Sequence, residues 1–540
     1  MLRYGGRKTA SFLLNVPKQA ITTARRLEGF DAPTVWQEFT PLAVKTKAVN
    51  LGQGFPDWAS PEFVKEALRS ATAADHNQYA RSAGDPVLVE ALASHYSPLV
   101  GRQIDGLTEV TVSVGATEAL YALMQAVINE GDEVVVLEPA FDTYPAQVQM
   151  AGGVCRYVPL TCDVKNVGVK GKSAWTLDMN QLEAAITPKT KLMLLNTPHN
   201  PTGKVLSLDE LLQISQILQR HPHVTAVCDE VYEKLVYDKR QHVRLASLPG
   251  MWDRTVTISS CGKTFSCTGW KVGWAYGPAH LIKPIMLANQ WIQYCVSTPT
   301  QRAVASVIIE SDKPYQGFKT YYDYVCAEYE KKRDDLASSL RDGKLIPVLP
   351  EGGFFIIADT SAYTPDVKYL NQPGPNGESP VSRDWAFARW LTCEAGVTPI
   401  PPSAFYCKAS AHQASRLGTF SPFSFICLLV YLLFTEISSS QPCECKPLIL
   451  QTILSSLCIL QDGSRSCGGK ETVTGPGFQE VEESQSLQSA HSQAPLAASI
   501  CKPGRMSCCR GSRAHERAMF CLGICQGSVE GILGVSFFGV

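Results

Sequence analysis

The sequence has very little net charge and no apolar run long enough to span a membrane. Its 540 residues carry 49 lysines and arginines against 50 aspartates and glutamates, a formal net charge of -1. Without a basic excess, the chain lacks the electrostatic footprint of proteins that bind nucleic acid or acidic membranes. The apolar stretch Phe420–Phe434 is shorter than the roughly 20 residues that a membrane-spanning helix needs. We therefore expect no nucleic-acid partner and no membrane partner, and we keep a membrane anchor at this stretch as the lesser alternative.

The cysteines also lack the spacing that is typical of a metal site. Of the 19 cysteines, nine precede residue 410 and are scattered singly, as in a reduced intracellular protein. The other ten lie in the C-terminal part, where Cys443-x-Cys445 and the adjacent Cys508–Cys509 form no recognisable zinc pattern. The sequence therefore predicts no metal site. It also shows that the two parts of the chain differ in composition.

Acidic side chains are absent from the first 27 residues, which carry six basic residues before the first acid, Glu28. A basic, hydroxyl-bearing and acid-free leader is typical of a mitochondrial transit peptide. A secretory signal would need a long apolar core, which this segment lacks. We expect a transit segment at residues 1–27 and a location in the mitochondrial matrix. A cytoplasmic chain with a basic arm is the alternative.

From residue 109 onward, short apolar runs rich in β-branched residues alternate with helical segments. The predicted strands are residues 111–115, Glu133–Leu137, Lys191–Leu195, Val224–Asp229 and Thr255–Ser259. The predicted helices are Thr117–Ile128, Leu208–Gln219 (with Ser207 and Glu210 as a capping box), Ile282–Ser311, Tyr321–Leu340 and Arg383–Glu394. A turn between two strands is predicted at Leu345–Asp359. Strands separated by helices favour a mostly parallel sheet with helices on both faces, so the predicted fold class is α/β.

Distinctive side chains follow the ends of the predicted strands. In a parallel sheet, ligands gather at the carboxyl ends of the strands. The residues found there are Ala116 and Thr117 at a helix start, Phe141, Asn196 and Asn200, Asp229 and Tyr232, and Ser260 with Lys263. A helix start favours a phosphate through its free N–H groups and its dipole. We therefore expect these residues to surround one ligand.

Lys263 lies in Ser259–Trp274, a run of small and apolar residues with few other charges. A desolvated lysine becomes a neutral amine that can form a Schiff base with a carbonyl. Lys271 keeps a positive charge nearby, which suits a ligand with an aldehyde and a phosphate. A buried Asp229 can hold a pyridine nitrogen protonated, while a tyrosine and an asparagine can bond the phenolic oxygen of the ring. Taken singly, Asp229 also fits a helix cap and Phe141 a core aromatic. Together, the five strand ends point to pyridoxal 5′-phosphate (PLP).

Seven motifs give the chain a family resemblance from about residue 25 to about residue 410. They are NLGQGFPDW, NQYARSAG, VGATEALY, NTPHNPTGKV, DEVYEKLVYD, LPGMWDRTVTISSCGKTFSCTGWKVGWAYGP and PPSAFY. Together they resemble the kynurenine/glutamine aminotransferase group of the fold-type I PLP enzymes. The resemblance implies a large PLP-binding domain at residues 61–311. It implies a smaller α/β domain formed by residues 28–60 and 312–416.

The resemblance also implies a role for each matching residue. Lys263 forms the Schiff base with the cofactor and moves the proton of the reaction, and Asp229 pairs with the pyridine nitrogen. Tyr232 and Asn200 bond the ring oxygen, and Phe141 stacks on the ring. The implied phosphate ligands are Ala116, Thr117, Ser260 and Lys271, joined by Tyr79 from the neighbouring subunit of a homodimer. The implied substrate-binding residues are Trp36, Gly54 and Asn200.

Two features depart from the family pattern. Thr117 stands where relatives often carry a tyrosine. In the family, a strand after SAFY carries an arginine that clamps the substrate α-carboxylate. Here Arg416 is the only arginine in reach, and it lies a few residues early. We interpret residues 417–540 as a divergent, poorly ordered tail from alternative splicing or a mispredicted gene end. It would replace the last strand and the last helix of the small domain.

The function implied by the resemblance is PLP-dependent transamination. The amino group of kynurenine, glutamine or a related aromatic or sulfur amino acid would pass to a 2-oxo acid, with cysteine-S-conjugate β-lyase activity as a side reaction. The alternative is a PLP-binding splice isoform that is catalytically impaired because the clamp is missing. A different fold-type I activity, such as a lyase, is the third hypothesis.

Overall fold

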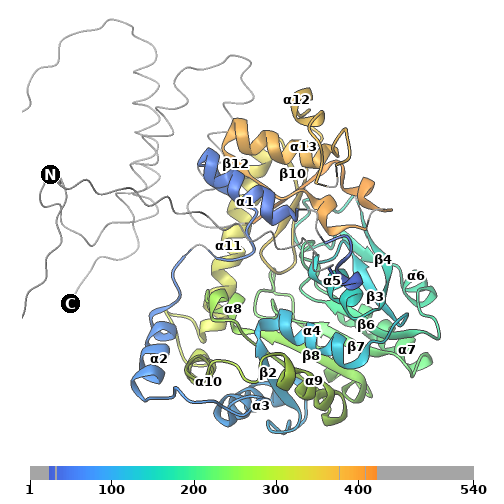
Figure 1. Cartoon of the computed structure of the whole chain (residues 1–540). Helices are drawn as coiled ribbons and strands as arrows, with labels where there is room; N and C mark the ends of the chain where they lie inside the picture. The colour runs from blue at the N-terminus through green and yellow to red at the C-terminus, as the bar shows by residue number, and fades with distance from the viewer. Residues whose placement is uncertain are drawn as a thin grey trace, which may run out of the picture. The chain divides into compact units, whose positions relative to one another are not determined.

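The structure is a computed structural model that describes residues 23–421, except residues 31, 32, 57, 164, 376 and 408. All of them fall in one compact unit of the chain, residues 1–443 (Figure 1). Residues 1–22 of the expected leader lie outside the described residues, as do residues 422–540 with almost all of the Phe420–Phe434 stretch. Within the described part, no helix combines the length and apolar character needed to cross a bilayer.

The larger sheet has eight strands in the order β2-β9-β8-β7-β6-β3-β4-β5. Their bounds are β2 Val110–Val114, β3 Glu133–Glu138, β4 Val154–Cys162, β5 Trp175–Leu177, β6 Thr190–Asn196, β7 Thr225–Asp229, β8 Thr255–Ser260 and β9 Val272–Tyr276. The neighbours β4, β3, β6, β7 and β8 pair in parallel, whereas β9 and β5 run antiparallel to their neighbours. The sheet is therefore mixed around a parallel centre, and the α/β prediction is confirmed.

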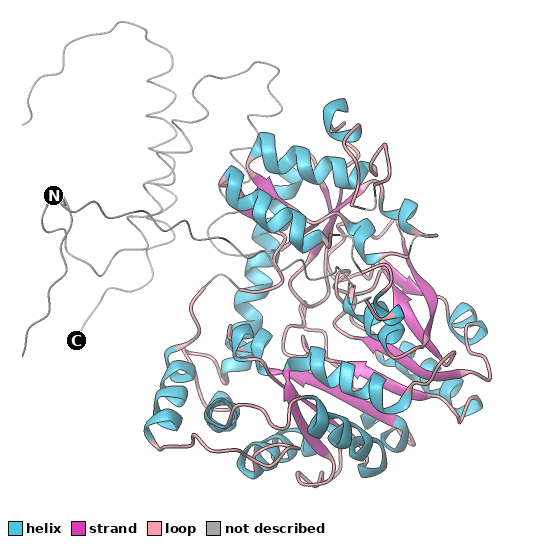
Figure 2. Cartoon of the chain, in the orientation of Figure 1, coloured by secondary structure: helices cyan, strands magenta, loops and turns pink. Residues whose placement is uncertain are grey.

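Alternating side chains of the parallel strands reach opposite faces of this sheet, and each face has its own core. Val134 and Val136 of β3 pack with α4 (Gly115–Val127) and α9 (Ala279–Ile292). Val135 and Leu137 pack on the other side with α7 (Leu208–Arg220). Figure 2 shows the helices around the strands. The predicted capping box of α7 is present, because Ser207 and Glu210 each bond the other's backbone N–H.

The remaining helices of this part are α2 Glu62–Ala73, α3 Pro86–Val100, α5 Thr143–Met150, α6 Met179–Ala184, α8 Cys261–Thr264 and α10 Thr298–Ser311. The single helix predicted over Ile282–Ser311 is wrong, because α9 ends at Ile292 and α10 begins at Thr298. Tyr294, between them, has a φ of 68° and lies in the left-handed region. That conformation interrupts the helix and turns the chain.

The smaller sheets lie together with a second group of helices (Figure 1). β10 (Ile346–Val348), β11 (Ile356–Asp359) and β13 (Leu417–Phe420) form an antiparallel sheet, and β1 (Val49–Asn50) pairs in parallel with β12 (Val397–Thr398). The helices are α1 Val35–Thr46, α11 Tyr321–Asp342, α12 Val367–Leu370 and α13 Arg383–Trp390. The turn predicted between two strands at Leu345–Asp359 is confirmed by β10 and β11.

β13 corrects one expectation about the small domain. The tail was expected to begin at residue 417 and to remove the last strand. The structure instead pairs Leu417–Phe420 with β11, opposite Asp359–Ile356. Phe420 is fully buried and joins the core around Leu336, Ile356 and Phe387. The strand could not be recognised in the sequence, because its four residues, LGTF, are too few for an alternating pattern and the composition changes after residue 415.

Among the residues that the structure describes, nine cysteines are free, and no cluster of His, Cys, Asp or Glu could hold a metal ion. Two of these cysteines are close in space although their positions looked unrelated in sequence. The Sγ atoms of Cys261 and Cys267 lie 3.8 Å apart, on either side of Lys263 in the chain.

Candidate active site

One cavity of about 320 Å³ collects most of the predicted site residues. It lies beside the carboxyl ends of β6, β7 and β8 and the start of α4. The predicted residues that line it are Trp36, Gly54, Ala116, Thr117, Phe141, Asn200, Asp229, Tyr232, Ser260, Lys263 and Lys271. Tyr79 is not among the lining residues; it is 82% exposed, and its ring packs against Tyr294 with centroids 5.1 Å apart.

Lys263 lies on the short helix α8, which begins directly after β8. Its Nζ donates a hydrogen bond to the carbonyl oxygen of Gly54. Burial lowers the pKa of Lys263 to about 8, with Asp229 acting to raise it and Lys271 to lower it further. At a pKa near 8, a substantial fraction of the amine is neutral close to physiological pH. Lys263 can therefore act as a nucleophile or a base.

Asp229 is the last residue of β7 and lies fully inside the protein. The hydroxyl of Tyr144 donates to its Oδ2 at 2.7 Å, and the Val231 N–H donates to its Oδ1 at 3.3 Å. Burial raises the pKa of Asp229 to about 6, although the bond from Tyr144 acts in the opposite direction. Tyr144 was missed in the sequence. It lies in the first turn of α5, and no local signal distinguishes it there from an ordinary core tyrosine.

Asn200 and Tyr232 face the cavity from two loops. The backbone N–H of Asn200 is held by the side chain of Asn196 at 2.6 Å, while its own Oδ1 is buried without a hydrogen-bond partner. A buried polar atom without a partner costs free energy unless a ligand or water satisfies it. Burial raises the pKa of Tyr232, so its hydroxyl keeps its proton and can donate. Both side chains are therefore available to a polar ligand in the cavity.

The start of α4 and Lys271 form a cationic corner of the cavity. Lys271 has a left-handed φ of 52°, and its Nζ lies 3.1 Å from the position that a Cβ on Gly115 would occupy. Gly273 brings β9 against the same turn, because a Cβ there would lie 2.5 Å from the backbone nitrogen of Ala116. Free N–H groups, the helix dipole and a lysine together form an anion site. Ser260 adds a hydroxyl from the end of β8.

The opposite wall is aromatic. Trp36 of α1 donates from Nε1 to Asp142 Oδ2 at 3.1 Å, which fixes its ring at the edge of the cavity. Phe355, just before β11, also lines the cavity, and its Cζ lies 3.8 Å from a Cβ added to Gly54. The neighbouring Phe354 has its ring centroid 5.1 Å from Lys263 Nζ. Neither phenylalanine was predicted from the sequence, because a pair of aromatic residues before a strand is typical of an ordinary hydrophobic core.

Arg416 does not reach this cavity. Its side chain is 68% exposed, and its Nη2 lies 3.8 Å from Asp359 Oδ2. Its Nε donates to Ser361 Oγ at 3.0 Å. In the part of the chain that the structure describes, the lining residues include no arginine, and their only cations are Lys263 and Lys271.

Known proteins resemble the chain over the region that builds this cavity. Residues 46–417 match the family model for class I and II aminotransferases. The kynurenine–oxoglutarate transaminase of Dictyostelium discoideum is 46% identical over 382 residues, which cover 69% of this chain and 87% of that protein. Kynurenine–oxoglutarate transaminase 3 of Mus musculus is 43% identical over 399 residues, covering 74% and 86%. The solved structure of N-succinyldiaminopimelate aminotransferase from Mycobacterium tuberculosis aligns with a TM-score of 0.67 and 34% identity, covering 77% of this chain and 99% of that one.

Proposed function

The chain belongs to the class I and II aminotransferase family, and on that premise we propose that it is a PLP-dependent kynurenine–oxoglutarate transaminase. It moves the amino group of kynurenine, glutamine or a related aromatic or sulfur amino acid to a 2-oxo acid. Relatives at 46% and 43% identity carry that name. The observation that carries the proposal is the pairing of Lys263 and Asp229 in one cavity, with the pKa of Lys263 lowered to about 8.

The family depends on PLP, and the residues around the cavity fit that group. The buried, unpartnered Oδ1 of Asn200 leaves a polar position for a ligand to satisfy. The corner at Ala116, Thr117, Ser260 and Lys271 suits the phosphate. Asp229 would hold the pyridine nitrogen, Tyr232 and Asn200 the ring oxygen, and Phe141 the ring face. When bound, the cofactor supplies an electron sink for negative charge at the substrate α-carbon.

Lys263 moves the proton on which this chemistry depends. Its Nζ would take the proton from the substrate α-carbon and deliver it to the carbon on the other side of the transferred nitrogen, a 1,3-shift. Only the neutral amine can accept a proton, and the lowered pKa of about 8 increases the neutral fraction at physiological pH. Asp229 supports the step from the end of β7, since its carboxylate is ionised above a pKa of about 6. Elimination from cysteine S-conjugates would follow from the same proton abstraction, as a side activity.

We further propose a homodimer. Tyr79 is 82% exposed and Trp291 of α9 is 84% exposed. Leu287, one helical turn before Trp291, is exposed on the same side. Large apolar side chains gathered on one surface favour a protein partner. A second copy would bring its Tyr79 toward the cationic corner. Analytical ultracentrifugation should give twice the chain mass, and a Trp291→Glu variant should sediment as a monomer.

The mitochondrial matrix is the location we propose, on the composition of residues 1–27 alone. A fluorescent fusion of the full chain should be imported into mitochondria. A fusion that lacks residues 1–27 should stay in the cytoplasm.

A second candidate function has one observation in its favour. The cavity lining of the described residues contains no arginine, and Arg416 is held at the surface by Ser361 and Asp359. A bidentate arginine is the usual way to hold a substrate carboxylate. The chain could therefore bind PLP and transfer amino groups poorly, as an impaired isoform.

One experiment tests both candidates. The purified chain is loaded with PLP, its visible absorbance is recorded, and kynurenine and 2-oxoglutarate are added. If the chain is a transaminase, its visible absorbance band should change when kynurenine is added, and glutamate should form from 2-oxoglutarate. A stable band that does not respond to any donor contradicts the transaminase and supports the impaired isoform. Failure to bind PLP contradicts both.

A further inference from the structure

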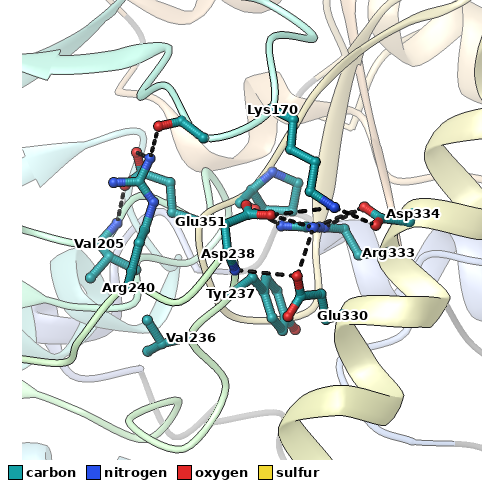
Figure 3. Close-up of polar contacts among 12 residues, drawn as sticks. Lys170, Val205, Val236, Tyr237, Asp238, Arg240, Glu330, Arg333, Asp334 and Glu351 are labelled. Atoms are coloured by element: carbon teal, nitrogen blue, oxygen red, sulfur yellow. Dashed lines mark hydrogen bonds and ion pairs between the residues drawn. The ribbon is translucent and has the colours of Figure 1, made fainter.

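A network of charged side chains surrounds one buried arginine between α11, the loop after β4 and Asp238 (Figure 3). Its centre is Arg333 of α11, which is 1% exposed. The guanidinium grips both oxygens of Asp238, with Nη1–Oδ2 at 2.7 Å and Nη2–Oδ1 at 3.0 Å. Lys170 approaches from the loop after β4, with its Nζ 3.0 Å from Asp334 Oδ2 and 3.6 Å from Asp238 Oδ1. A bidentate, buried pair of this kind fixes geometry as well as charge.

The network joins two chain segments that run side by side. Arg333 Nη1 also donates to the Pro350 carbonyl at 3.2 Å, and its guanidinium lies 4.9 Å from the ring of Tyr237. The Tyr237 N–H donates to the Glu351 carbonyl at 2.8 Å, and the Gly353 N–H donates to the Leu235 carbonyl at 2.9 Å. We call residues 235–238 and 350–353 the paired segments.

The side chain of Tyr237 adds the bond closest to the cavity. Its hydroxyl donates to the carbonyl of Gly353, the residue directly before Phe354. Glu351 fastens the same segment to the loop that carries Asn200, because its Oε2 accepts from the Val205 N–H at 2.8 Å. The segment that leads to the Gly353–Phe354 peptide is therefore held by two contacts, one from the Tyr237 hydroxyl and one between Glu351 and Val205.

Each paired segment continues into the cavity. Residues 235–238 follow Tyr232, and residues 350–353 lead into Phe354 and Phe355. The rings of Tyr232 and Phe354 meet edge to face with centroids 5.1 Å apart, and Phe355 lines the cavity. A shift of the paired segments would therefore move the aromatic wall relative to Lys263, since packed interiors transmit displacement.

We propose that Arg333 and Tyr237 are positioning residues that set the aromatic wall and thereby determine selectivity for aromatic amino donors. Neither residue lines the cavity, so both act through Phe354 and Phe355. This inference rests on the proposed transaminase function. A purely structural role would change stability and affect all donors alike. A positioning role raises the KM of an aromatic donor and spares a small donor such as alanine.

The test uses the PLP-loaded full chain with Tyr237→Phe and a matched control, Tyr363→Phe. The Tyr363 hydroxyl also donates to a glycine carbonyl, that of Gly343 at 2.8 Å, but remote from the cavity. One lost hydrogen bond corresponds to roughly a three- to tenfold change. We expect Tyr237→Phe to raise the kynurenine KM by that factor, with the alanine KM and the PLP affinity unchanged within about twofold. Tyr363→Phe should leave all three unchanged.

A second pair of variants tests the charge network. Arg333→Lys keeps the positive charge but loses the bidentate contact to Asp238. Arg389→Lys is its control, because Arg389 also contacts both oxygens of one carboxylate, that of Glu38, through Nε at 2.5 Å and Nη2 at 3.1 Å. Hydrogen–deuterium exchange of the 350–355 peptide should rise in Tyr237→Phe and Arg333→Lys and stay unchanged in both controls. If Arg333→Lys does not fold, the KM values and the exchange of the Tyr237→Phe variant alone test the positioning role.

Equal KM shifts for kynurenine and alanine, or equal effects in the control variants, would overturn the positioning role. If the wild type uses phenylalanine but not kynurenine, the proposed donor is wrong, and the aromatic-to-small comparison is made with phenylalanine. If it uses no donor, the proposed function fails. In that case, unchanged exchange at 350–355 overturns the positioning role, and raised exchange in the two variants alone supports it.

Discussion

The residues around the cavity come from two regions that differ in completeness. The eight-stranded sheet supplies Asp229 at the end of β7, Lys263 after β8 and the anion corner at the start of α4. The smaller sheets and α1 supply the aromatic wall with Trp36 and Phe355. The first region supplies three charged side chains, Asp229, Lys263 and Lys271, which suit the ring nitrogen, the aldehyde and the phosphate of PLP. Among the described residues of the second, no arginine lines the cavity to meet a substrate carboxylate.

This difference shows how each region obtains its functional groups. Parallel strands end at one edge, so five separate motifs meet there whatever follows later in the chain. The smaller sheet is completed by β13, its last strand, and only Leu417 of that strand lies within the matched region, which ends at residue 417. We expect a change in the chain after that point to alter substrate binding before it affects the cofactor corner.

Replacing Lys263 should have the largest effect. A Lys263→Ala variant loses the amine that takes the substrate proton, so kcat should fall by about a thousandfold or more. The measurement is glutamate formation from 2-oxoglutarate with kynurenine as donor. Lys45→Ala, an exposed lysine on α1, is the control and should keep wild-type activity. A loss of less than about tenfold in Lys263→Ala would contradict the assigned role.

Lys271→Gln should weaken the cofactor corner without reaching the aromatic wall. Losing one charged contact to a phosphate should lower the PLP affinity by about 10- to 100-fold, since a charge-assisted bond contributes about 1.5–3 kcal/mol. Lys271 also lowers the pKa of Lys263, so its removal should move that pKa above about 8. The activity would then require a higher pH, because only the neutral amine of Lys263 accepts a proton. PLP titration by absorbance and a pH profile measure the two effects, and unchanged PLP affinity would contradict the first.

Much of this cavity could be predicted from sequence because strand ends and glycine-rich turns carry local signals. Lys263, Asp229 and Asn200 each follow a short apolar run, and parallel topology then brings them together. Tyr144 and Phe355 could not be assigned in the same way. Their roles depend on tertiary contacts, a hydroxyl reaching Asp229 and a ring facing Gly54, that no local pattern encodes.

The fold shows the same limit. The parallel centre of the large sheet was predicted, whereas β9 was not, because VGWAY reads as part of the lysine motif rather than as a strand. β13 was expected to be lost because composition changes around it. It forms nonetheless, since Thr419 exchanges two backbone hydrogen bonds with Ile400 at 3.0 Å and Phe420 fills the core. The strand therefore depends on backbone pairing with β11 and Ile400, which a local sequence pattern does not reveal.

Tyr144→Phe should give a smaller, pH-dependent effect on the large-sheet side. The Tyr144 hydroxyl stabilises the ionised form of Asp229 and so lowers its pKa, against burial, which raises it to about 6. Without the hydroxyl, the charged form loses a donor and the pKa rises further. The acidic limb of the kcat profile should therefore move to higher pH, with activity at pH 8 nearly unchanged. Tyr363→Phe is the control, and an acidic limb that stays in place would show that Tyr144 does not tune Asp229.

Arg416→Ala should have the smallest effect of all. An arginine that held the substrate carboxylate would raise the donor KM greatly when removed, because a bidentate charged contact would be lost. Arg416 instead lies at the surface against Ser361 and Asp359, and exposed pairs of this kind contribute about 0–1 kcal/mol. The KM for kynurenine should therefore change by less than about twofold, and the unfolding midpoint by only a little. A tenfold increase in KM with unchanged kcat would instead place Arg416 at the substrate, and would remove the difference between the two regions.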